Sequence, residues 1–87
     1  MAQKDLTLYQ NKILLKLRRN FYIGSRHTSE DNVIKGFPKD VRGDIKKALK
    51  KLIKNGYLIS KPTSYGLEVS INPVMMKEIN KILEEDG

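Results

Sequence analysis

The side chains best suited to chemistry in this 87-residue chain are basic, and they gather in one stretch. Between Lys35 and Lys61 there are nine lysine and arginine residues against two aspartates, whereas basic and acidic residues cancel in the rest of the chain. The formal net charge of +7 therefore comes from this stretch alone. A local excess of positive charge attracts a polyanion, so the stretch predicts nucleic-acid binding, the alternative being a solvated lysine face.

The remaining polar residues do not favour a catalytic or metal site. Ser25, His27 and Asp31 are the residue types of a catalytic triad, but they share one short polar segment with no nucleophile elbow or oxyanion hole. Asp40 and Asp44 stand one helical turn apart, but the lysines around them disfavour a bound cation. With one histidine and no cysteine, the chain offers neither a zinc site nor a disulfide. We therefore expect no enzyme, no metal and no cofactor.

The basic residues lie on a helix predicted over residues 39–55. At about 100° per residue, one face of this helix is apolar and carries Val41, Ile45, Ala48, Leu49 and Leu52. The other face is basic and carries Lys39, Arg42, Lys46, Lys50 and Lys54. Gly56 supplies the left-handed residue that commonly ends a helix. Gly43 costs the helix about 1 kcal/mol relative to alanine, and it either lets a phosphate backbone approach closely or marks a junction of two helices.

Two shorter helices are expected before this one. Residues 7–10 match a capping box with Thr7 as N-cap, which predicts a first helix to about Arg19. Its core face comprises Tyr9, Ile13, Leu14, Leu17 and, just beyond the helix, Phe21. A short extended segment is expected over residues 21–24. A second capping box, with Thr28 as N-cap, opens a brief helix that Gly36 and Pro38 close.

A β-hairpin and a last helix complete a single α+β domain over residues 1–87. Residues 57–61 and 67–71 favour strands, joined by a five-residue tip over residues 62–66. Asn72 and Pro73 are typical of an N-cap and the first residue of a helix. The chain has no apolar run long enough for a membrane span, and its first residues lack the apolar segment of a signal peptide. We therefore expect a cytoplasmic protein with no membrane contact.

This order of elements resembles the winged helix-turn-helix superfamily. The most specific part, DIKKALKKLIKNGYLISKPTSYGLEVSINP, is similar to the third helix and wing of small archaeal winged-helix DNA-binding proteins. The resemblance covers nearly the whole chain and implies a three-helix core with a β-hairpin wing and a C-terminal helix. It also implies a transcription regulator whose third helix enters the major groove of double-stranded DNA.

The same resemblance assigns expected roles to the basic residues. Four of them are candidates to face the groove: Lys39, Arg42, Lys46 and Lys47. Arg42 is the candidate for reading guanine, because its planar fork matches two acceptors, unless it pairs with a nearby aspartate. Lys50 and Lys54 are candidate phosphate contacts. Further candidates are Lys61, Ser64 and Tyr65 on the wing, and Arg26 and His27 before the second helix.

Two other functions stay open. The same fold could bind RNA or a protein partner in the transcription or translation machinery through the same basic helix. The chain could instead be a structural module or homodimer, whose candidate interface comprises Leu8, Leu15, Met75 and Met76. Scattered exposed leucines are the ordinary alternative for Leu8 and Leu15.

Overall fold

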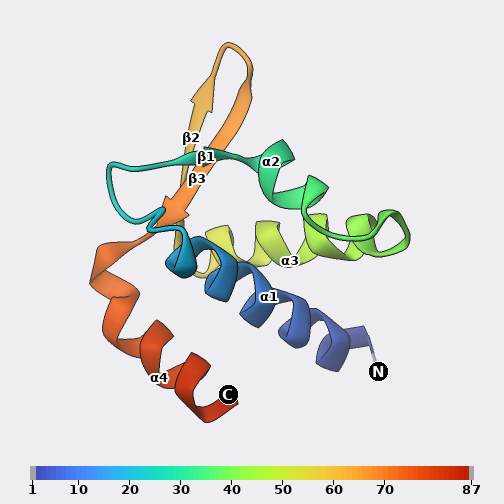
Figure 1. Ribbon diagram of the computed structural model, residues 1–87, viewed down its shortest axis with the longest axis vertical. Helices are drawn as coiled ribbons and strands as arrows, with labels where there is room; N and C mark the ends of the chain where they lie inside the picture. The colour runs from blue at the N-terminus through green and yellow to red at the C-terminus, as the bar shows by residue number, and fades with distance from the viewer. Residues whose placement is uncertain (1, 87) are drawn as a thin grey trace.

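A computed structural model describes residues 2–86, with side chains described for residues 8–84 (Figure 1). Its helices are α1 (Ala2–Arg19), α2 (Glu30–Lys35), α3 (Arg42–Lys54) and α4 (Met76–Asp86). Its strands are β1 (Thr28–Ser29), β2 (Leu58–Thr63) and β3 (Gly66–Ile71), which form an antiparallel sheet in the order β1-β3-β2. Short 3-10 turns, η1 (Lys39–Val41) and η2 (Pro73–Met75), precede α3 and α4. The predicted α+β class is confirmed.

The core lies where α1, α3 and the lower part of the hairpin meet (Figure 1). Fully buried apolar side chains come from all three: Ile13, Leu14, Leu17, Ile45, Ala48, Leu49, Leu52, Val69 and Ile71. Burying one such large side chain contributes about 1.5–3 kcal/mol, so the apolar face of α3 is held firmly inward. The opposite face of α3 is therefore turned toward solvent.

The predicted N-cap at Thr7 is wrong, because α1 begins at Ala2 and continues through residue 7. The upstream residues are mostly good helix formers, such as alanine, glutamine, lysine and leucine. A capping box starts a helix only where the residues before it stop one. Nothing in residues 2–6 does so.

The predicted core position of Phe21 is also wrong, because its side chain is 69% exposed. Phe21 has a φ of 60°, in the left-handed region, and ends α1 in a Schellman motif. In this motif the Phe21 N–H donates to Arg18 O and the Tyr22 N–H donates to Leu17 O. Because the left-handed residue ends the helical periodicity of α1, the Phe21 side chain does not point toward the core as the helical wheel predicts.

The second helix starts one residue later than predicted. Ser29, not Thr28, is the N-cap of α2, and its Oγ accepts the Asn32 N–H at 3.0 Å. Thr28 belongs instead to β1, where it pairs with Val69. Because Thr28 pairs with β3, the N-cap of α2 moves one residue on, to Ser29. The extended segment expected at residues 21–24 is reduced to one bridge between Ile23 and Ile71.

The predicted five-residue hairpin tip is wrong, because only residues 64–65 lie between the strands. β2 continues through Pro62, which pairs with Leu67. A proline is tolerated there because β2 is an edge strand of the sheet. The Thr63 hydroxyl stiffens the tip, since it donates to Gly66 O at 2.7 Å and accepts the Tyr65 N–H at 3.2 Å.

The predicted start of the last helix is confirmed. Asn72 is the N-cap of η2, its side chain accepts the Val74 N–H at 3.1 Å, and Pro73 is the first residue of the turn. α4 continues from Met76 and buries Ile79 against the core. Within residues 2–86, no helix combines the length and the apolar character that crossing a membrane requires.

Candidate nucleic-acid interface

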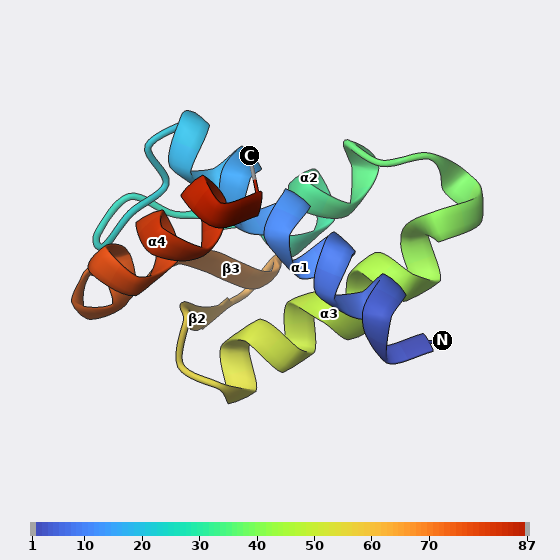
Figure 2. The same cartoon turned by 90° about the horizontal axis from the view of Figure 1, so that it is seen from below.

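α3 presents a basic surface to solvent. Five of its side chains are exposed lysines, which we call the α3 lysine face: Lys46, Lys47, Lys50, Lys51 and Lys54. Figure 2 shows α3 along one edge of the molecule, with no other helix or strand on its outer side. Lys51 was not among the predicted residues, although it lies one helical turn beyond Lys47, which was, and belongs to the same exposed arc.

No carboxylate among the described side chains neutralises the α3 lysine face. The ion pairs within residues 8–84 join His27 to Glu68 and Lys35 to Asp31, and neither involves α3. Asp44, in the first turn, is the only acidic residue in the sequence of α3. Positive charge without a partner inside the protein keeps its attraction for an external polyanion.

Gly43 leaves the helix backbone bare within the same exposed arc. It precedes Lys47, Lys50 and Lys54 by four, seven and eleven residues, which places all four positions on one line along α3. A Cβ built at Gly43 meets no atom within 4 Å, and its φ is not positive. Neither packing nor backbone conformation therefore requires glycine here. The change of helix type falls at the end of η1, before Gly43.

Arg42 binds the turn that precedes α3. Its Nε donates to Phe37 O at 3.0 Å, and its Nη2 donates to Lys35 O at 3.2 Å. These carbonyl groups lie at and just beyond the C-terminal end of α2, where a helix leaves acceptors unpaired and favours a cation. The partners of Arg42 are thus carbonyl groups and not the aspartates considered for it. Its role in reading guanine stays a prediction, and so does that of Lys39, which is exposed in η1.

The hairpin carries an aromatic side chain at its tip. Tyr65 is 100% exposed, and Ser64 beside it is also exposed. The Thr63 hydrogen bonds fix the backbone that presents both residues. Lys61 is exposed as well, but it stands opposite Glu68 in the strand register. That carboxylate lowers the positive charge halfway along the hairpin, at the third strand pair from the tip.

Arg26 and His27 both contact other parts of the protein. His27 Nδ1 lies 3.5 Å from Glu68 Oε1, which ties the loop before β1 to the hairpin. The Arg26 guanidinium lies 5.6 Å from the centre of the Tyr22 ring. Arg26 is nevertheless exposed, so its remaining donors can reach a phosphate. For both residues, phosphate binding stays a prediction.

The four residues predicted for a homodimer interface are not equally available. Leu15, Met75 and Met76 are half-buried and pack against the core. Leu8 is 49% exposed. Of the four predicted interface side chains, only Leu8 is therefore exposed. The homodimer stays a prediction.

Comparisons with protein-family models, with curated proteins and with solved structures find no match to this chain.

Proposed function

We propose that this protein is a winged-helix transcription regulator that binds double-stranded DNA, with α3 in the major groove and the β2–β3 hairpin as the wing. The observation that carries the proposal is the α3 lysine face, which is exposed and has no carboxylate partner among the described side chains. The wing tip, with Ser64 and Tyr65, supplies a second contact to phosphates or to the minor groove.

The dimensions of α3 favour duplex DNA over duplex RNA. Its 13 residues make a rod about 20 Å long that lies on one edge of the molecule (Figure 2). The major groove of B-DNA is about 12 Å wide and admits such a helix, whereas the major groove of A-form RNA is deep and narrow. Bare backbone at Gly43 lets α3 lie deeper than a helix covered by side chains.

Binding through lysines makes a quantitative prediction about salt. If all five residues of the α3 lysine face contact phosphates, the logarithm of the association constant falls with the logarithm of the salt concentration with a slope of about −4 to −5. Fluorescence anisotropy of a labelled duplex at several salt concentrations measures this slope. A slope near zero contradicts the proposal.

Charge reversal on α3 tests which face binds. We expect the double variant Lys46→Glu, Lys50→Glu to lose duplex binding. The matched control is Lys77→Glu, Lys81→Glu, which changes the net charge equally through two exposed lysines of α4. The control should keep most of the affinity. Equal losses in the two variants mean that net charge alone matters, and full affinity in the α3 variant means that another surface binds.

Competition between nucleic acids separates the proposal from its alternatives. Unlabelled duplex DNA should displace the labelled duplex at lower concentration than a structured RNA of equal phosphate content. Tighter displacement by the RNA would assign the α3 lysine face to RNA. Absence of binding to either nucleic acid would favour an acidic protein partner.

A further inference from the structure

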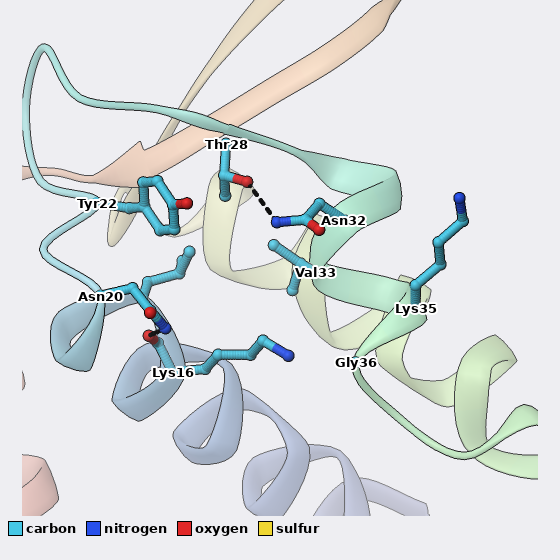
Figure 3. A pocket seen from close by; sticks show the side chains of 9 residues that line it. Lys16, Asn20, Tyr22, Thr28, Asn32, Val33, Lys35 and Gly36 are labelled. Atoms are coloured by element: carbon cyan, nitrogen blue, oxygen red, sulfur yellow. Dashed lines mark hydrogen bonds between the residues drawn. The ribbon is translucent and has the colours of Figure 1, made fainter.

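A pocket lies between the C-terminal half of α1 and α2 (Figure 3). Its volume is about 440 Å³, within the range of small-molecule sites, about 300–1,000 Å³. The buried side chains of Leu17 and Val33 give it an apolar floor. In Figure 3 the ribbon of α3 runs behind the pocket, so the pocket opens away from α3. Nucleic-acid binding by α3 makes no use of it.

Lys16 brings a positive charge into this pocket. Its side chain is half-buried, and its ammonium group lies 5.4 Å from the centre of the Phe37 ring. No carboxylate in residues 8–84 pairs with it. An ammonium group that has no carboxylate partner in the protein keeps its attraction for an external anion. An anion in the pocket would supply that partner.

Gly36 keeps the space in which this ammonium group lies. A Cβ at Gly36 would collide with Lys16 Nζ. Gly36 caps α2 with φ −72° and ψ −4°, a conformation open to any residue, so its backbone does not require glycine. A side chain at position 36 would therefore displace the Lys16 ammonium group, the flexible end of its side chain, from its present position.

The other polar groups of the pocket supply both donors and acceptors. The Tyr22 hydroxyl makes no hydrogen bond to the described part of the protein, so it can donate to a ligand. Asn20 donates its amide hydrogen to Lys16 O, and Asn32 donates to Thr28 Oγ1, each at 2.8 Å. Both asparagines thereby keep their carbonyl oxygens available as acceptors.

We propose that this pocket binds a small organic acid with an apolar body and a hydroxyl or amine group. The carboxylate meets Lys16, while the Tyr22 hydroxyl and the asparagine oxygens face the hydroxyl or amine group, and the apolar body covers Leu17. Phosphate-rich ligands fit less well, since the other ammonium group at the pocket, that of Lys35, is paired with Asp31 at 3.2 Å.

Three related compounds test the chemistry of the site. Mandelate carries a carboxylate, a hydroxyl group and an apolar ring, phenylacetate lacks the hydroxyl, and benzyl alcohol lacks the carboxylate. In amide NMR titrations of the full chain, mandelate should give saturable shifts in residues 16–22 and 28–36. It should bind about tenfold or more tighter than benzyl alcohol, because a charge-assisted hydrogen bond is lost, and about threefold tighter than phenylacetate.

Three variants test the residues. Lys16→Met should weaken mandelate binding about tenfold or more, and Tyr22→Phe by a smaller factor. Lys12→Met is the matched control, because Lys12 lines an adjoining hollow and not this pocket. It should bind mandelate as the unchanged protein does, and well-dispersed amide spectra establish that each variant is folded.

Several results would overturn the proposal. Mandelate that binds no tighter than benzyl alcohol removes the role of the carboxylate. A Lys16→Met variant that keeps full mandelate affinity removes the role of Lys16. Stronger shifts of the same amides by inorganic phosphate or by duplex DNA would instead assign the pocket to phosphate groups.

Discussion

Replacing Gly43 with alanine should stabilise the protein and weaken its binding to DNA. Position 43 lies in the first turn of α3, and the added methyl group meets no atom within 4 Å. The free energy of unfolding should therefore change by the intrinsic helix preference alone, up to about 1 kcal/mol in favour of alanine. For a domain of this size, the full amount corresponds to a rise in Tm of about 4–8 °C.

The same methyl group stands in line with the lysines that we propose meet the duplex. It would hold the α3 backbone away from the groove at the one exposed position where no side chain covers it. We expect duplex affinity to fall by roughly threefold to tenfold, the size of losing one phosphate contact. Stability and affinity thus move in opposite directions, which a general loss of structure cannot produce.

Gly56→Ala is the matched control. An added methyl group there also meets no atom within 4 Å, but Gly56 has a φ of 84°. Alanine in this left-handed conformation should cost about 1–2 kcal/mol, so the same substitution should lower Tm. Urea unfolding of both variants and anisotropy with a labelled duplex give the two readouts. A Gly43→Ala variant that is stabilised and binds DNA with unchanged affinity would refute close approach at this position.

Three further substitutions test single features of the fold. Arg42→Met should lower the free energy of unfolding by about 1–3 kcal/mol, because it leaves two carbonyl groups without their charged donor; unchanged urea unfolding would contradict this role. Phe21→Asn should raise Tm, since asparagine tolerates the left-handed φ of 60° better than phenylalanine does, and a lower Tm would show that the exposed ring stabilises the fold. Burial and the Glu78 carboxylate raise the pKa of Tyr57 above its ordinary 10.0, so the native state holds this proton more tightly than the unfolded chain does. Stability from this group is present below pH 10 and is lost as the pH rises through the raised pKa, and Tyr57→Phe should flatten this alkaline decline in unfolding experiments.

The sequence predicts an element well when neighbouring residues alone set both its apolar periodicity and the residue at which it starts or stops. α3 has one apolar face and ends just before Gly56. Asn72 and Pro73 start η2, the turn that leads into the last helix, as expected. The capping box at Thr7 failed because its effect depends on whether the residues before it favour a helix. The hairpin tip was predicted too long because Pro62 breaks most strands, and only the order of strands reveals that β2 is an edge.

The candidate site likewise has some features that the sequence predicts and others that it does not. The exposure of Lys46, Lys47, Lys50 and Lys54 follows from the helical period, which the sequence carries in full. The contacts of Arg42 do not, because its acceptors are backbone carbonyl groups brought close by a turn whose geometry no pattern encodes. The pocket beside Lys16 is equally invisible in the sequence, since it joins residues of α1, the following loop and α2.

An amide NMR titration of the full chain with a generic DNA duplex tests the central claim most directly, because it locates contact residue by residue. We predict that the largest chemical-shift changes fall on α3 from Gly43 to Lys54 and on the wing tip at Ser64 and Tyr65. The amide signals of α4 should not shift. Shifts concentrated on α4 or on the exposed side of α1, with α3 unchanged, would contradict the assignment of the α3 lysine face to DNA.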